Sequence, residues 1–462
     1  MLTSTLSNSG TLMKKRIIVL TAILLSPAVL AKTVSISSPD GKITLSVNDD
    51  KGPNYRVSFN DKKTILPSRL GMTFKNAPAF AEGFTISKSE TVSAKQTWQQ
   101  PWGERKHVVD NHNELLVTFS AQRESANTFK IRFRVFDDGL GFRYEVPKQT
   151  GLDKVEITDE LTEFTIGNAK TATAWWIPAR GWNRYEYIYH TTSLESVDRV
   201  HTPFTFKLDS GTHISIHEAA LVDYAAMTLN QQRPGTLKAD LTPWSDGIRA
   251  KTKTEFNTPW RTIQISQDAD GLLNSDLILN LNEPSKIADT SWIEPGKYVG
   301  IWWGMHVREN TWGSGEAHGA TTSETKRYMD FAAKYGFDGV LVEGWNIGWD
   351  GDWFHNGDLF NFTQAYDDFD IKAVTDYGLN KGVRLIGHHE TSGSVSNYRK
   401  QMADAFALYK KHGVRQVKTG YVADGGNIKR IDENGIARVF GGHPQYNDNA
   451  YFIQTNCALE MP

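Results

Sequence analysis

The stretch Arg384-Leu-Ile-Gly-His-His-Glu390 is a short apolar run that ends in two imidazoles and a carboxylate. Such a run is typical of a buried parallel strand, and α/β folds place their chemistry at the carboxyl ends of these strands. A carboxylate that ends an apolar strand is costly to bury without a partner. We therefore predict that Glu390 is a catalytic group, with a structural ion pair to Lys418 as the alternative.

Strands and helices alternate on both sides of this stretch. Strands are expected at residues 298–306, 339–345, 383–390 and 416–422, and helices at 322–335, 371–381 and 395–412. This alternation predicts consecutive βα units around a parallel sheet. Eight units would close a (β/α)8 barrel and four are visible, so residues 298–436 are predicted to form the first half of a barrel. Residues 437–462 form an atypical tail without a clear βα continuation, and the chain is expected to be truncated or frame-shifted there.

The preceding part of the chain has a different rhythm. From residue 32 to 282 the apolar residues alternate with polar ones, and turns such as Pro39-Asp-Gly41 and Asp137-Asp-Gly139 separate the runs. Many short strands of this kind predict a large antiparallel β-sandwich. Residues 283–297, which contain two prolines, are expected to be a linker to the barrel.

Residues 1–31 have the pattern of a secretory signal peptide, with Met13 as a candidate start. A basic segment, Lys14-Lys-Arg16, precedes an apolar run and a small-residue cleavage site that ends at Ala31. No other window approaches a membrane span, and the single cysteine, Cys457, excludes an intramolecular disulfide. The mature protein is therefore expected to be periplasmic or secreted.

The composition narrows the class of partner. The chain has 51 basic and 53 acidic residues, which gives no polybasic surface for nucleic acid. The 14 tryptophans suit surfaces that stack on sugar rings, or a large core. Nothing in the sequence indicates the oligomeric state.

In a barrel the strand ends converge on one mouth, so residues far apart in sequence meet there. We expect the four strand ends to bring the following residues to this mouth: Trp302, Trp303 and His306 from the first strand, Glu343, Trp345 and Asn346 from the second, His388, His389 and Glu390 from the third, and Lys418, Gly420 and Tyr421 from the fourth. Glycoside hydrolysis needs carboxylates on both sides of the scissile bond, with aromatic floors and hydrogen-bonding groups for the hydroxyls. The set has this composition and predicts an oligosaccharide substrate.

Several alternatives stay open for these residues. Glu343 could instead cap the next helix, and the loop at residues 345–353 could use its tryptophans as its own small core. His388 and His389 should point to opposite faces of a strand, so at most one faces the mouth, and a zinc site is disfavoured. In the β-domain, Glu218 ends an apolar strand, where it could bind a hard cation or pair with a buried arginine.

Five stretches together resemble glycoside hydrolase family 97, over residues 32 to 423. They are Gly296–Trp303, His318–Thr322, Asp338–Trp349, His388–Thr391 and Val417–Tyr421. The resemblance is to the inverting α-glucosidases of starch-utilisation systems and implies a β-super-sandwich, a (β/α)8 barrel and calcium at the active site.

The resemblance also implies roles for individual residues. Glu390 matches a base that activates water. His388, Lys418 and Glu343 match residues that hold the sugar, and Glu218 matches a calcium ligand. Retaining α-galactosidases of the family carry an aspartate nucleophile where this sequence has Gly420, which favours the inverting route.

Two other readings remain. A retaining α-galactosidase could use Asp424 as the nucleophile, and a non-catalytic or degenerate carbohydrate-binding protein would explain the tryptophans. The family's general acid lies on later barrel strands that this chain lacks, and Glu433 and Glu460 match nothing in the family.

Overall fold

The computed structural model describes residues 31–122, 127–179, 187–244, 246–354, 356–392 and 394–420, and the backbone of 427–431 and 437–441. Apart from Ala31, the predicted signal peptide lies outside these residues, as do Asp424, Glu433, Cys457 and Glu460. Among the described residues, no helix is both long and apolar enough to cross a bilayer.

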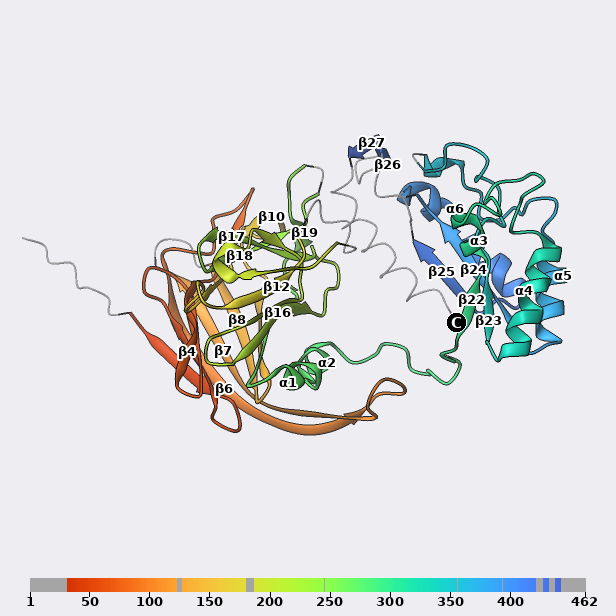
Figure 1. The fold of residues 1–462 in the computed structure, drawn as a ribbon. Helices are drawn as coiled ribbons and strands as arrows, with labels where there is room; N and C mark the ends of the chain where they lie inside the picture. The colour runs from red at the N-terminus through yellow and green to blue at the C-terminus, as the bar shows by residue number, and fades with distance from the viewer. Residues whose placement is uncertain are drawn as a thin grey trace, which may run out of the picture. The chain divides into compact units, whose positions relative to one another are not determined.

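The described strands between residues 33 and 266 form antiparallel sheets (Figure 1). The first sheet has eight strands, in the spatial order β1 (Thr33–Ser37), β2 (Ile43–Asn48), β3 (Asn54–Phe59), β4 (Lys62–Arg69), β11 (Glu163–Ile166), β18 (Thr236–Leu241), β17 (Met227–Arg233) and β14 (Arg199–Val200). A three-stranded sheet has the order β19 (Ala250–Lys253), β10 (Lys154–Glu160) and β5 (Met72–Phe74).

The largest sheet has ten strands, and its long hairpin β6–β7 forms one edge. The spatial order is β13 (His190–Ser193), β12 (Thr173–Trp176), β15 (Phe204–Lys207), β16 (His213–Ala219), β21 (Trp260–Ser266), β9 (Gly139–Val146), β8 (Thr128–Phe136), β7 (His107–Ala121) and β6 (Phe84–Gln99), with β20 (Phe256–Asn257) beside β9. Short helices η1 (Leu194–Ser196), α1 (Ala269–Leu273) and α2 (Leu277–Leu281) complete this part.

One apolar core joins the two large sheets. Tyr55 of β3 contacts Phe142 of β9 with ring centroids 5.1 Å apart, and Phe142 is 6.4 Å from Phe164 of β11. Along β2 and β8 buried residues alternate with more exposed ones, as the period-two pattern predicted. The prediction of an N-terminal β-sandwich is therefore confirmed.

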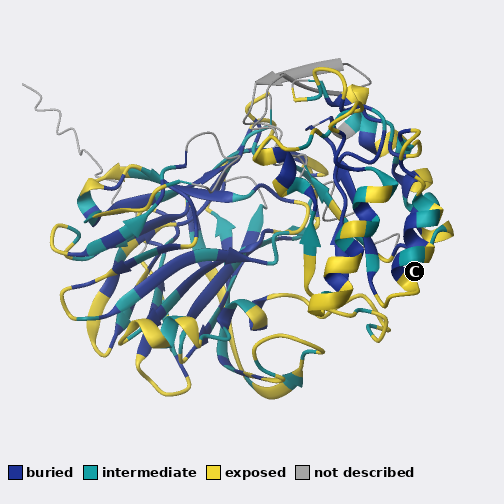
Figure 2. Cartoon of the chain, turned by 45° about the vertical axis from the view of Figure 1, so that its right-hand side comes forward, coloured by how far each residue is buried: buried dark blue, intermediate teal, exposed yellow. Residues whose placement is uncertain are grey.

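The second part contains a four-stranded parallel sheet whose strands follow chain order (Figure 1). The elements are β22 (Tyr298–Gly300), α3 (Trp302–His306), α4 (Thr322–Tyr335), β23 (Gly339–Leu341), η2 (Gly357–Leu359), α5 (Ile371–Leu379), β24 (Arg384–Glu390), α6 (Val395–Lys411) and β25 (Gln416–Gly420). An antiparallel pair follows, β26 (Asn427–Ile431) and β27 (Ala437–Gly441). Figure 2 shows the central strands buried and the helices exposed on one side.

Two of the predicted strands are much shorter in the structure. The strand expected at 298–306 ends at Gly300, and Trp302 lies in α3 instead. Gly300 permits this turn, because a Cβ there would lie 2.4 Å from the Trp302 indole. The strand expected at 339–345 ends at Leu341, and Gly344 turns the chain away with a φ of 87°.

Candidate active site at the ends of the parallel strands

Glu343 is the centre of a polar cluster just beyond the end of β23. Its Oε1 lies 3.2 Å from Lys418 Nζ at the end of β25 and 3.5 Å from His388 Nε2 on β24. Its Oε2 accepts a hydrogen bond from Trp312 Nε1 at 3.3 Å. The carboxylate is buried, whereas the Lys418 side chain is 49% exposed, so the cluster opens to solvent on the lysine side. The ends of three neighbouring strands thus bring Glu343, His388 and Lys418 together as predicted.

His388 and His389 diverge, as the alternation of side chains along a strand predicted. His388 faces Glu343, while Nδ1 of His389 lies 3.0 Å from the Tyr398 hydroxyl and its ring stacks on Tyr409 at 4.9 Å. Burial lowers the pKa of His388 to about 4 and the pKa of His389 to about 3. Both imidazoles are therefore neutral at physiological pH, and His389 belongs to the core.

Glu390 ends β24 on the same strand face as His388. It is only 1% exposed, and its Oε1 accepts a hydrogen bond from the Ser392 backbone N–H at 2.6 Å. Lys418 contacts Glu343 rather than Glu390, so the structural ion pair proposed as the alternative is wrong. The burial means that a catalytic role requires water and sugar to reach this carboxylate from the strand end.

Gly420 lies directly opposite Glu390 in the register of β24 and β25. Its φ is 149°, and a Cβ placed on it would have no atom of the described residues within 4 Å. The side-chain space at the end of β25 is therefore open among these residues.

Aromatic rings surround the Glu343 cluster. Trp312, which is half-buried, stacks on Trp349 with centroids 6.2 Å apart and touches His306 edge-on at 5.3 Å. Trp302 is also half-buried and packs edge-on against His306 at 5.0 Å. The indole of Trp312 is a site residue that the sequence did not predict, because it follows no strand.

Trp345 is not a sugar-facing residue, and this prediction is wrong. Its side chain is 2% exposed and packs against Phe369 and Tyr409, and its Nε1 donates a hydrogen bond to the His388 carbonyl at 3.0 Å. Trp349 is also buried, in a small apolar cluster with Phe360. These tryptophans are therefore core residues, but Trp345 joins the core of the parallel sheet and Trp349 packs with residues of α6, so the loop does not form a separate core of its own as the alternative predicted.

Glu218 occupies the buried ion pair that was the alternative to a metal site. Its Oε2 lies 2.7 Å from Arg261 Nη1, and its Oε1 accepts from the Met227 N–H at 2.9 Å. Arg261 also binds Glu160 through Nε and Nη2, at 2.8 and 2.6 Å. Both Glu218 oxygens are occupied and a guanidinium lies beside them, so the residue does not fit a calcium ligand.

No group of three His, Cys, Asp or Glu side chains within the described residues could hold a metal ion. The calcium that the family resemblance implies stays a prediction.

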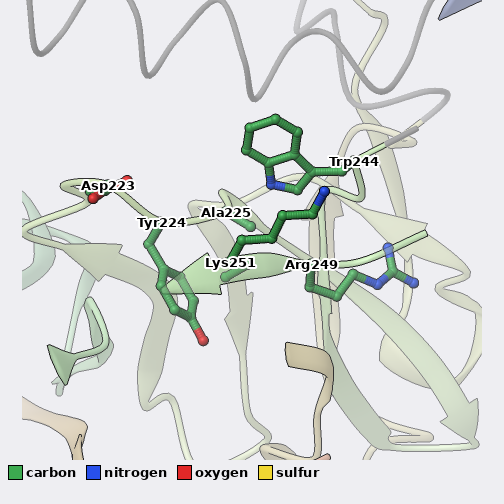
Figure 3. A pocket seen from close by; sticks show the side chains of 7 residues that line it. Asp223, Tyr224, Ala225, Trp244, Arg249 and Lys251 are labelled. Carbon is green, nitrogen blue, oxygen red and sulfur yellow. The ribbon is translucent and has the colours of Figure 1, made fainter. Parts of the chain in front are cut away.

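Two surface pockets of the β-domain contain none of the predicted site residues. One holds about 20 Å³, room for roughly one water, and Figure 3 shows Trp244 beside Lys251 in it, with the ammonium 5.1 Å from the ring centroid. The other holds about 280 Å³ among charged residues such as Arg132, Arg143 and Glu145, which already pair with one another. Neither pocket has the chemistry of a hydrolytic site.

Comparison with solved structures finds a glycoside hydrolase family 97 enzyme from Pseudoalteromonas sp. strain K8, in complex with acarbose. It is 63% identical, with a TM-score of 0.87, and the match covers 91% of this chain and 64% of that one. A β-arabinopyranosidase has a TM-score of 0.72 at 20% identity, over 92% of this chain and 65% of the other, and shows a shared fold.

Curated relatives include a retaining alpha-galactosidase of Bacteroides thetaiotaomicron, 22% identical over 89% of this chain and 63% of the relative. A probable retaining alpha-galactosidase of Streptomyces bingchenggensis is 24% identical over 87% of this chain and 62% of the relative. The chain thus spans a little under two thirds of the length of these relatives.

Two family models match the chain in succession. The Glycosyl-hydrolase 97 N-terminal model matches residues 36–284, more than half of the chain, and the Glycoside hydrolase 97 model matches residues 302–453. Most of the β-sandwich, the parallel strands β23 to β25, and the residues Glu343, His388, Glu390 and Lys418 lie within these matches, and the chain belongs to glycoside hydrolase family 97.

Proposed function

We propose that this protein is the N-terminal portion of an inverting, exo-acting α-glucosidase that removes glucose from malto-oligosaccharides. The observation that carries the proposal is the Glu343 cluster, in which a carboxylate, an ammonium, an imidazole and an indole meet beside the strand that ends in Glu390. Such a set can hydrogen-bond several hydroxyls of one sugar while an aromatic ring covers its apolar face. Structures of the similar Pseudoalteromonas enzyme were solved in complex with acarbose and with panose. Panose consists of glucose units, and acarbose contains glucose and glucose-like units.

In this mechanism water attacks the anomeric carbon from the side opposite the leaving group. Glu390 accepts the proton of that water, and the leaving oxygen takes a proton from an acid. The open side-chain space at Gly420 supports inversion, because a retaining enzyme would carry its nucleophile there, whereas an inverting enzyme needs room for water. In the family that this chain resembles, the general acid that protonates the leaving oxygen lies on later strands of a (β/α)8 barrel. We therefore propose that the four parallel strands are the first half of such a barrel.

We also propose that the chain consists of a signal peptide (1–31), a β-domain (32–282), a linker (283–297), a half-barrel (298–436) and a tail (437–462), and that it is exported to the periplasm or beyond. The N-terminal residue of the exported protein tests the first part, with Lys32 as the expected start. Calcium remains an expectation from the resemblance.

Proton NMR of the first-formed sugar anomer tests the mechanism. Hydrolysis of an α-linked maltosaccharide should first release β-glucose, and first release of α-glucose would rule inversion out. Glu390→Gln should abolish this turnover, whereas Glu316→Gln, which changes an exposed carboxylate of the same domain, should not.

A retaining α-galactosidase is the second candidate, because both curated relatives carry that name. It would act on α-galactosides through Asp424, which lies outside the described residues. Asp424→Ala would then abolish activity and Glu390→Ala would leave part of it, and the opposite ranking excludes this candidate.

A carbohydrate-binding protein without catalysis is the third candidate. Calorimetry with maltose, run beside a chromogenic α-glucoside assay, separates it from the enzymes. Binding without release of the chromophore supports the binder, and turnover eliminates it.

A further inference from the structure

The early end of β23 leaves part of β24 without a neighbour on one side. β23 ends at Leu341, which pairs with Ile386, whereas β24 continues to Glu390. In a parallel sheet the N–H and C=O groups of alternate residues point to opposite neighbours. Ile386 C=O accepts from Val342 N–H on the β23 side at 3.4 Å, so the backbone groups of His388 also point to this side, beyond the last residue of β23.

The side chain of Tyr409, from α6, binds these two backbone groups. The His388 N–H donates to the Tyr409 hydroxyl at 3.0 Å, and that hydroxyl donates to the His388 carbonyl at 3.2 Å. Trp345 Nε1 donates to the same carbonyl at 3.0 Å. The side chains of Trp345 and Tyr409 are almost fully buried, so bulk water does not reach the His388 N–H and C=O. Buried backbone groups need hydrogen-bond partners, and these two side chains supply them.

The ring of Tyr409 is itself fixed between β24 residues. A Cβ at Gly387 would lie 2.5 Å from two ring carbons, so only glycine leaves space for the ring. On the same strand face, His389 stacks on the ring at 4.9 Å with an angle of 12° between the planes. Gly387 and His389 thus hold the tyrosine hydroxyl in line with the backbone of the residue between them.

We propose that Tyr409 is a positioning residue of the glycosidase site, whose hydroxyl fixes the backbone of His388 and thereby the directions of the His388 and Glu390 side chains. The role rests on the proposed function, because it concerns the sugar-binding and base residues of that site. It acts on geometry alone, since Tyr409 lies on the helix side of the sheet and touches neither carboxylate in the described contacts. Displacement of a catalytic group by about 1 Å can lower a rate by about a hundredfold.

The experiment compares Tyr409→Phe with the matched variant Tyr398→Phe. Both tyrosines are buried on α6, and both hydroxyls lie about 3.0 Å from a polar group of β24. The Tyr409 hydroxyl contacts the His388 backbone N–H, and the Tyr398 hydroxyl contacts the His389 ring. A purely structural role predicts that the two variants lose similar stability and similar activity.

The positioning role predicts different results for the two variants. Tyr409→Phe should lower kcat on an α-glucoside by roughly ten- to a hundredfold, and Tyr398→Phe should keep kcat within about twofold of wild type. Hydrogen exchange of the 384–390 peptide, followed by mass spectrometry, should become faster in Tyr409→Phe only. Equal kcat in Tyr409→Phe and wild type, or equal losses in both variants, would overturn the proposal.

Two further measurements keep the test decisive. If Tyr409→Phe does not fold, Trp345→Phe removes the other donor to the His388 carbonyl and should give the same faster exchange in the 384–390 peptide. If wild type shows neither turnover nor maltose binding, the proposed function fails. The exchange comparison then still decides whether Tyr409 fixes His388.

Discussion

Removal of the guanidinium of Arg261 tests the ion-pair assignment of Glu218. Arg261 is fully buried and makes three charge-assisted contacts of 2.6–2.8 Å with Glu160 and Glu218. Arg261→Met keeps an apolar chain of similar length but leaves two buried carboxylates without their cation. Loss of one partner from a buried ion pair costs about 3–5 kcal/mol, and we expect a loss of this size in the free energy of unfolding at neutral pH.

Glu218→Gln provides the contrast. Arg261 keeps both contacts to Glu160, and an amide oxygen can still accept from the Met227 N–H, so we expect a loss of only roughly 1–2 kcal/mol. Burial already raises the pKa of Glu218, so this carboxylate should take up a proton in Arg261→Met as the pH falls. The deficit of Arg261→Met relative to wild type should therefore shrink in mildly acidic buffer.

Urea unfolding followed by tryptophan fluorescence, with excess EDTA or excess calcium, measures these differences. The ion-pair assignment predicts that any effect of calcium on wild type is also present in Glu218→Gln. A calcium-dependent rise in stability that disappears in Glu218→Gln would identify a metal ligand and refute our reasoning. Arg261→Met with wild-type stability would refute the predicted cost.

Three further predictions concern the parallel sheet. Glu343→Gln should weaken maltose binding by roughly ten- to 150-fold, because a charge-assisted hydrogen bond contributes about 1.5–3 kcal/mol, and unchanged affinity in calorimetry would contradict this. A histidine in the unfolded chain has a pKa of about 6.5, whereas burial in the folded protein lowers the pKa of His388 to about 4 and that of His389 to about 3. The unfolded state therefore binds more protons than the folded state below about pH 6.5. As the pH is lowered through this range, the free energy of unfolding should decrease by up to roughly 1.4 kcal/mol per pH unit for each histidine. Denaturant titrations of wild type and His389→Gln check this, and an equal slope in both would exclude a contribution from His389. Gly387→Ala should cost about 1–3 kcal/mol, because the added methyl meets the Tyr409 ring, and a thermal scan without a lower midpoint would show that the ring can move away.

The order of elements could be predicted from the sequence because their ends carry local signals. Helix α4 begins and ends where expected, since the Thr321 side chain caps its first turn and Gly336 ends it in a left-handed conformation. The first two parallel strands were predicted too long. Apolar runs continue past Gly300 and Leu341, and an apolar residue suits a buried turn or short helix as well as a strand.

The candidate site shows the same limit. Glu343, His388 and Lys418 could be predicted because parallel strands end at one edge of the sheet. Trp345 could not be placed correctly, because alternation no longer holds once the chain has left the sheet at Leu341. Trp312 could not be found, since its contact with Glu343, 31 positions later in the sequence, depends on how the glycine-rich loop before α4 folds.

The close approach of Gly387 to the Tyr409 ring links two positions 22 residues apart in the sequence. A side chain larger than hydrogen at 387 would meet the Tyr409 ring, and a residue smaller than an aromatic at 409 would leave a void, so we expect the two positions to be substituted as a pair. An alignment of homologous sequences should show any side chain larger than hydrogen at position 387 together with a smaller residue at position 409. Such compensated pairs would also indicate which relatives orient the strand end by other means.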